Sequence, residues 1–312
     1  MSLSRRNFLK GLGVGAGMAA GGVNLLYNAP TAAAQGVPMG RAYYRTMLGD
    51  FEVTVIRDAV STLDIGTLVA NAEAEAVNDL LASYNFPTGP QPNNFKQLLV
   101  NTGDALVLVD TGLGSPDSQL MPTLEELGVA PGDITNVVLT HWHPDHVGGA
   151  VLDGSPAFPN ATYHMAQVEW DNINSNPDNQ GFQGALQALQ PILDADALVY
   201  FEQGTELLPG IEAVAAPGHT VGHTGLRMTS GEMSLMNTVD AIIHPVVSTR
   251  QTDWFFGFDS NPEQAVETRR SLLSTIADEG MLMFGYHFPF PGIGVVTALE
   301  EENSFQFTPF SY

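Results

Sequence analysis

Four side chains that can bind a metal ion lie within six residues of one turn. His141, His143, Asp145 and His146 belong to the stretch THWHPDHVGG at residues 140–149, directly after the apolar, β-branched run ITNVVL. This run is typical of a buried strand, and the proline and paired glycines of the motif predict a turn at its carboxyl end. One tetrahedral zinc ion does not normally take all its ligands from a single loop. The crowding therefore predicts two metal ions, one bound by His141 and His143 and the other by Asp145 and His146.

The motif resembles the HxHxDH signature of the metallo-β-lactamase superfamily, and the resemblance extends over residues 110–287. Further ligand positions of the family correspond to His219 in APGHTVGH, to Asp240 in NTVDAIIH as the bridging carboxylate, and to His287 in GYHFPFPG. Asp110 in LVLVDTG corresponds to the aspartate that supports the metal loop. The closing HFPFPG is similar to the branch that contains methyl parathion hydrolase and its quorum-quenching lactonase relatives. The resemblance implies an α/β fold, the αββα four-layer sandwich, as a single domain.

The resemblance also implies a dinuclear centre in which two divalent metal ions hold a bridging hydroxide. Zinc is expected, with manganese, cobalt or iron as alternatives, and the ligands must be histidines and carboxylates because the chain contains no cysteine. Asp145 and Asp240 are the expected catalytic carboxylates. Two ions, two carboxylates and one hydroxide leave about one positive charge, which can polarise a substrate oxygen. The expected metal ligands are His141, His143, Asp145, His146, His219, Asp240 and His287.

Two further residues are expected to support these ligands. Asp110 ends an apolar strand beside the metal loop, where its charge would be costly without a partner. His223 follows His219 by four residues in a PGHTxGH turn and is expected to support that loop without binding metal.

Four side chains are candidates for the wall of a substrate pocket. Phe288 and Phe290 follow the expected ligand His287 closely in the sequence. His244 and Trp170 are the other two candidates. All four have a structural alternative, because aromatic side chains commonly belong to a protein core.

The chain begins with a segment that resembles an export signal. Arg5 and Arg6 precede a glycine- and alanine-rich apolar run that ends in small residues. This pattern predicts a twin-arginine signal at residues 1–34 and a hydrolase domain at residues 35–312, located in the periplasm or secreted. A retained membrane anchor is the alternative, although glycines interrupt the apolar run.

The chain is strongly acidic, with 34 acidic against 11 basic residues and a formal charge of −23. Residues 1–34 contain three of the basic residues and no acidic one, so residues 35–312 carry a formal charge of −26. Such a field opposes binding to nucleic acid, which depends on lysine and arginine at phosphates. The same field disfavours anionic substrates, and the family resemblance implies a small neutral ester, lactone or phosphotriester as the partner.

Strand and helix patterns predict two similar halves. A helix is expected from Ser115 as N-cap to Gly128, and the clearest helix lies between Asn261 as N-cap and Gly280. Residues 65–95 combine a helical pattern with a breaker-rich stretch, which predicts a lid or a homodimer contact, with an ordinary surface insertion as the alternative. Strands are expected at 43–49, 51–59, 96–101, 105–109, 134–139, 161–165, 197–201, 211–216, 225–229, 233–239, 281–287, 295–301 and 304–310.

Several functions share this ligand pattern. A β-lactamase is disfavoured because Asp240 stands where those enzymes lack the bridging carboxylate. A glyoxalase II-like thioesterase would be expected to use basic groups to bind glutathione, and this chain has few. A hydrolase of acyl-homoserine or aryl lactones and aryl esters, with phosphotriester hydrolysis as main or side activity, meets neither objection. The non-enzymatic alternative is a periplasmic metal-binding protein.

Overall fold

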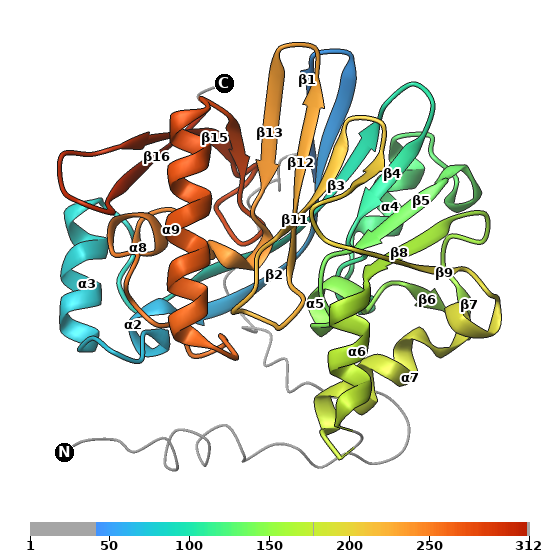
Figure 1. Ribbon diagram of the computed structural model, residues 1–312, viewed down its shortest axis with the longest axis horizontal. Coiled ribbons are helices and arrows are strands. Elements are labelled where there is room, and N and C mark those ends of the chain that lie inside the picture. Colours follow the sequence, from blue (N-terminus) through green and yellow to red (C-terminus); the bar gives the residue numbers. More distant parts are fainter. Residues whose placement is uncertain (1–41, 177, 311–312) are drawn as a thin grey trace. The chain divides into compact units, whose positions relative to one another are not determined.

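Two seven-stranded sheets are the main elements of the protein (Figure 1). The computed structural model describes residues 42–176 and 178–310. The expected signal at residues 1–34 lies outside the described residues. Within the described ranges, which belong to one compact unit, no helix is both long and apolar enough to cross a bilayer.

The first sheet has the strand order β1-β2-β3-β4-β5-β8-β9. Its first four strands are antiparallel neighbours, whereas β4, β5, β8 and β9 run parallel. Parallel neighbours need crossover connections, and these connections carry the metal motif and several helices. The strands are β1 (Tyr43–Leu48), β2 (Phe51–Asp64), β3 (Pro90–Asn101), β4 (Leu106–Val109), β5 (Asn136–Leu139), β8 (Thr162–Ala166) and β9 (Leu198–Phe201).

The second sheet has the order β10-β11-β12-β13-β14-β15-β16. All of its neighbours are antiparallel except β13 and β14, which run parallel and are joined by a long crossover. Its strands are β10 (Glu206–Leu208), β11 (Ile211–Ala215), β12 (Thr224–Ser230), β13 (Met233–Asn237), β14 (Leu282–Phe284), β15 (Ile293–Ala298) and β16 (Phe305–Pro309). A separate two-stranded ribbon contains β6 (Val151–Leu152) and β7 (Ser155–Pro156).

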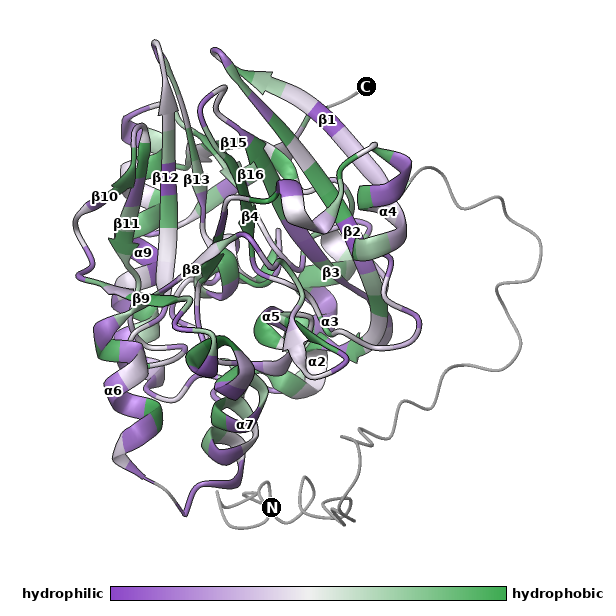
Figure 2. Cartoon of the chain, turned by 90° about the vertical axis from the view of Figure 1, so that its right-hand side faces the viewer, coloured by the Kyte–Doolittle hydropathy of each residue, from purple (hydrophilic) through white to green (hydrophobic). Residues whose placement is uncertain are grey.

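Helices cover the outer face of each sheet. Apolar residues of α4, α6 and α7 pack on the first sheet, and those of α9 pack on the second. Figure 2 shows α6 as largely hydrophilic, whereas the neighbouring strand β9 is largely hydrophobic. The helices are α2 (Ile65–Leu68), α3 (Ala74–Ser83), α4 (Leu120–Glu126), η1 (Pro131–Asp133), α5 (Pro144–Val147), α6 (Gln167–Ser175), α7 (Gln180–Asp194), η2 (Val239–Ala241), α8 (Val247–Arg250) and α9 (Pro262–Asp278).

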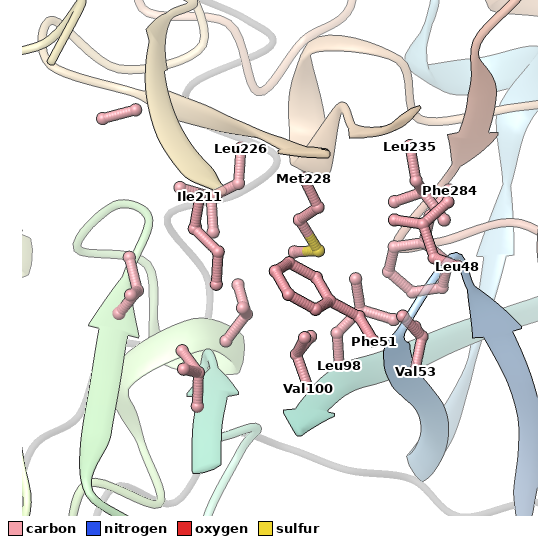
Figure 3. Close-up of a cluster of buried hydrophobic side chains, with 14 of the residues drawn as sticks. Leu48, Phe51, Val53, Leu98, Val100, Ile211, Leu226, Met228, Leu235 and Phe284 are labelled. Carbon is pink, nitrogen blue, oxygen red and sulfur yellow. The ribbon is translucent and has the colours of Figure 1, made fainter. Parts of the chain in front are cut away.

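An apolar cluster with residues from both sheets fills the space between them (Figure 3). Each fully buried valine, leucine, isoleucine, methionine or phenylalanine of this cluster contributes roughly 1.5–3 kcal/mol through removal of apolar surface from water. The order of layers is therefore helix, sheet, sheet, helix, which confirms the expected αββα sandwich. The facing residues include Leu48, Phe51, Val53, Leu98 and Val100 from the first sheet and Ile211, Leu226, Met228, Leu235 and Phe284 from the second.

Two expected helices differ in how well the sequence predicts their ends. The prediction for α9 is confirmed, because the Asn261 side chain accepts a hydrogen bond from the backbone N–H of Gln264. The predicted start of α4 at Ser115 is wrong, since this helix begins at Leu120. Asp58 of β2 accepts hydrogen bonds from the Leu120 N–H and from a hydroxyl in the preceding turn. A distant carboxylate thus replaces the local N-cap.

Residues 65–95 contain more regular structure than the sequence pattern predicts. β2 extends to Asp64, and β3 begins at Pro90 inside the breaker-rich stretch. Between them, apolar residues of α2 and α3 form a separate cluster with Val247 and Phe256. This segment therefore covers the chain that follows Asp240.

Candidate metal centre

The expected ligands lie in loops that follow the carboxyl ends of strands. His141 comes two residues after β5, and His219 comes four residues after β11. Asp240 and His287 each come three residues after β13 and β14, which are parallel neighbours. Because the carboxyl ends of parallel strands share one edge of a sheet, these loops meet at one end of the sandwich.

Four side chains form what we call the first group: His141, His143, His219 and Asp240. The Nδ1 atom of His143 lies 3.0 Å from Nε2 of His141 and 2.9 Å from Nε2 of His219. The Asp240 Oδ2 atom lies 3.3 Å from Nε2 of His219 and 3.9 Å from Nε2 of His141. Three imidazoles and one carboxylate therefore converge on one point.

A second group consists of Asp145, His146, Asp240 and His287. The His146 Nε2 atom lies 3.5 Å from Oδ2 of Asp145 and 3.4 Å from Oδ1 of Asp240. His287 Nε2 lies 3.2 Å from Oδ2 of Asp240 and 3.7 Å from Oδ2 of Asp145. Asp240 belongs to both groups, which places a carboxylate where a bridging ligand would lie.

These donors fit two divalent metal ions. Within each group the ligand atoms lie within 4.8 Å of one another. Bonds of about 2.1 Å in a tetrahedron place donors about 3.4 Å apart, close to the distances observed. Among the described residues, His146 Nε2 and Asp240 Oδ1 are buried without a hydrogen-bond partner. A bound cation would satisfy both atoms, whereas leaving them unpaired is costly.

Burial keeps the His143 imidazole of the first group neutral, which is the form that binds metal. It lowers the pKa of His143 to about 3, and the neighbouring His219 adds to this effect. Burial also disfavours the protonated ring of His219, but hydrogen bonds to Asp240 and Asp259 outweigh this and raise its pKa to about 9. A neutral imidazole is the metal ligand, so binding at His219 would displace a proton.

Asp110 lies directly behind the metal motif. One of its oxygens accepts the Thr140 N–H at 2.9 Å, and the other lies 2.8 Å from Nδ1 of His146. The second oxygen also accepts the Thr140 hydroxyl, which in turn lies 3.2 Å from Nδ1 of His141. Asp110 adopts φ +60°, a conformation that is uncommon outside glycine. Its carboxylate therefore orients histidines of both groups.

Both ring nitrogens of His223 form hydrogen bonds with backbone groups. Its Nδ1 lies 3.1 Å from the Ala216 carbonyl oxygen, and its Nε2 accepts the Asp240 N–H at 3.1 Å. With both nitrogens engaged, the ring links the loop of His219 to the loop of Asp240. The structure thus places it as a support for the ligands.

A buried glutamate on α6 joins two ligand loops, and the sequence analysis missed it. Glu169 accepts the Trp142 N–H at 3.2 Å and the Gly222 N–H at 2.8 Å. Burial raises the pKa of its carboxyl. A signal was present, because Glu169 lies on the helix face of Ile173, which is buried one turn later.

A second carboxylate that the sequence analysis missed lies behind His219. Asp259 Oδ1 is 3.1 Å from Nδ1 of His219, and its other oxygen accepts a hydrogen bond from Arg269 at 3.4 Å. Arg269 also donates to three backbone carbonyl oxygens and is fully buried. Asp259 precedes a helix start in a loop, where no sequence pattern distinguishes it.

The four candidates for a pocket wall lie in different environments. Phe288 is fully buried and packs edge-on against Phe307 in the core, so the structure does not place it in a pocket wall. Phe290 lines an apolar cavity of about 670 Å³ that also contains Phe86 and Phe310. This volume is typical of small-molecule sites.

His244 and Trp170 do not contact the two groups. The His244 Nδ1 accepts two backbone N–H groups, of Val246 and Val247, and its ring lies 5.1 Å from that of Phe86. Burial lowers the pKa of His244 to about 3, so the ring is neutral. Trp170 packs on the ring of Tyr200 over the outer face of the first sheet. Among the described residues, neither side chain forms a hydrogen bond or ring contact with a member of the two groups, and their assignment to a pocket wall stays a prediction.

Comparison with known proteins reveals related sequences. The family model described as the metallo-beta-lactamase superfamily matches residues 97–287, more than half of the chain. A probable metallo-hydrolase of Mycobacterium tuberculosis is 29% identical over 192 residues, 47% of this chain and 56% of that protein. The chain thus spans about half the length of this relative. An N-acyl homoserine lactonase of Bacillus thuringiensis is 24% identical over 213 residues, 61% of this chain and 79% of that protein.

Solved structures share the fold over most of the chain. AidC, a dizinc quorum-quenching lactonase, has a TM-score of 0.80 and 26% identity, covering 87% of this chain and 98% of its own. The hydrolase AbOPH of the beta-lactamase superfamily has a TM-score of 0.80 and 25% identity, and the match covers 88% of this chain and 99% of AbOPH. The motif order, the αββα sandwich and the family match agree, and the chain belongs to the metallo-beta-lactamase superfamily.

Proposed function

We propose that the protein is a dinuclear metal-dependent hydrolase that acts on neutral lactones and esters. The observation that carries the proposal is the convergence of seven side chains into two groups that share Asp240. Two bound divalent ions would supply a water activated to hydroxide near neutral pH and would polarise the substrate oxygen. Zinc is the first candidate, because histidine and carboxylate donors at these distances suit it.

The two aspartates of the centre differ in their access to substrate. Asp240 lies between the groups, and its side chain is 6% exposed. The side chain of Asp145 is 19% exposed, so its carboxylate is the more open to a bound molecule. We assign to Asp240 the role of holding the two ions together. We assign to Asp145 the exchange of a proton with the reacting water or the leaving oxygen.

Charge and surface chemistry support a neutral, partly apolar substrate. The formal charge of −26 on residues 35–312 repels anions, although salt screens this effect over about 8–10 Å. The apolar cavity that Phe290 lines lies next in the chain to the loop of His287, although none of the seven expected ligands lines it, and a substrate that reaches it would gain from hydrocarbon groups. The relatives named as N-acyl homoserine lactonases agree with this substrate class. We therefore expect acyl-homoserine or aryl lactones to have the highest kcat/KM, followed by aryl esters. Hydrolysis of phosphotriesters is expected as a main or side activity.

A substrate panel tests the proposal. At one metal composition and one ionic strength, kcat/KM is measured for hexanoyl-homoserine lactone, dihydrocoumarin, p-nitrophenyl acetate, methyl parathion, S-lactoylglutathione and a β-lactam. We expect at least one neutral lactone or ester to reach about 10⁴ M⁻¹ s⁻¹, the lower end of ordinary enzyme efficiency. A preference for the glutathione thioester or the β-lactam would overturn the substrate class. No turnover by protein that holds two ions would instead favour a metal-binding protein.

A further inference from the structure

Tyr286, the residue before His287, is fully buried between β3 and the metal motif. Its hydroxyl donates a hydrogen bond to the backbone carbonyl of Asp145 at 2.5 Å and accepts one from the Gln97 side-chain amide at 2.9 Å. Its ring stacks on that of His146 with centroids 4.1 Å apart and planes at 30°. Tyr286 thus contacts both ligands that the metal motif contributes to the second group.

Gln97 belongs to a run of four β3 residues that hold the segment around His287. The Asn94 carbonyl oxygen lies 3.0 Å from Nδ1 of His287 and can only accept, so Nδ1 carries the proton and Nε2 faces the centre. The Phe95 ring lies edge-on to the His287 ring at 5.6 Å. Lys96, which is fully buried, donates to the carbonyl oxygen of Pro291 at 3.1 Å. One strand therefore fixes this whole loop.

Asp145 needs an external support because its own helix is very short. It lies on α5, which has one turn, and a single turn fixes several backbone dihedrals for one hydrogen bond. Pro144 and Asp145 thus gain little order from the helix itself. The Tyr286 hydroxyl reaches the backbone of Asp145 from the opposite side of the sandwich. A bond of this kind sets where the carboxylate of Asp145 points.

We propose that Tyr286 is a positioning residue for the second metal ion, linking β3 through Gln97 to the backbone of Asp145. The inference rests on the dinuclear centre of the proposed function. The expected effect is confined to the second ion. Among the contacts of the described residues, no hydrogen bond or ring contact joins Tyr286 to His141, His143 or His219. Loss of the hydroxyl should therefore weaken the second ion and leave the first in place.

The test is the substitution Tyr286→Phe, with zinc counted after dialysis of the full protein against a competing chelator. Loss of a group that orients a ligand weakens metal binding by about 10- to 100-fold, so we expect about two ions per chain in the wild type and about one in the variant. Tyr163→Phe is the matched control. The Tyr163 hydroxyl, also buried, accepts one backbone N–H and donates to one carbonyl, but it supports Ala150 and Phe158. This control should keep both ions.

A second variant separates positioning from general loss of stability. Tyr286→Phe leaves the buried amide of Gln97 without its acceptor, and adding Gln97→Leu removes that amide. We expect the double variant to regain thermal stability in the metal-free state while still retaining about one ion. Adding His143→Ala to Tyr286→Phe should release the remaining ion.

The outcomes distinguish the two proposals. A wild type that binds fewer than two ions overturns the dinuclear centre and this inference together. A wild type with two ions and a Tyr286→Phe variant that also holds two, with unchanged affinity, overturns the inference alone. So does equal loss of both ions in the variant.

Discussion

Asp240 is the residue that the two groups of expected metal ligands share. Its oxygens lie within reach of donors in both groups, and its backbone N–H is held by His223. The residue before it, Val239, has φ +46°, which is strained for a β-branched side chain. A strained backbone persists only where its surroundings enforce it. The loop therefore holds Asp240 in a fixed place.

Substitution of Asp240 tests this role directly. We expect Asp240→Ala to lower both zinc content and kcat, the latter by more than about 100-fold, because a shared ligand and the charge it supplies are lost together. The exposed Asp278 at the end of α9 provides a control, and Asp278→Ala should keep both properties. Wild-type zinc content in Asp240→Ala would show that the carboxylate does not bridge.

The side chains that gather in the two groups were predictable from the sequence, as were two of the residues expected to support them, whereas three other supporting residues were not. His141, His143, Asp145 and His146 share one short motif, so their types and spacing suffice. Tyr286 acts through a backbone carbonyl more than a hundred residues away, and such a contact leaves no local pattern. Phe288, adjacent to His287, faces the core instead of a pocket because neighbours in an irregular loop point in different directions.

The predicted ends of helices and strands were correct where the residues that define them lie in the local sequence. The α9 helix begins and ends with its own capping residues, so its limits follow from the sequence. The start of α4 depends on Asp58, which lies far away in the chain. Likewise, β3 begins in a proline-rich stretch because β2 pairs with it over that length. Tertiary contacts override local propensity at these places.

The helix α6 connects two ligand loops through Glu169, and this can be tested. In Glu169→Gln the amide can accept one N–H but turns an NH₂ toward the other. We expect the metal-free variant to lose about 1–3 kcal/mol in free energy of unfolding. We also expect the zinc ion held by the first group to bind about tenfold more weakly. Chemical denaturation and chelator competition measure the two effects. Behaviour identical to that of the exposed control Glu125→Gln would show that the two loops are held by other contacts.

For the whole molecule, we propose that residues 1–34 direct export. Arg5→Lys combined with Arg6→Lys should keep the protein in the cytoplasm, since a twin-arginine pathway reads both arginines. The retained protein should still be active, because every expected ligand lies at or beyond residue 141. Cell fractionation with an activity assay measures both results. Unchanged periplasmic accumulation of the double variant would contradict the proposal.

The central claim is that hydrolysis requires both metal ions. The most direct measurement is the rate of hydrolysis of one neutral lactone, such as hexanoyl-homoserine lactone, by metal-stripped protein to which zinc is added in steps. Because Asp240 links the two groups, we predict little activity with one ion per chain and a steep rise as the second binds. Full activity at one ion per chain, or in protein without metal, would contradict the account.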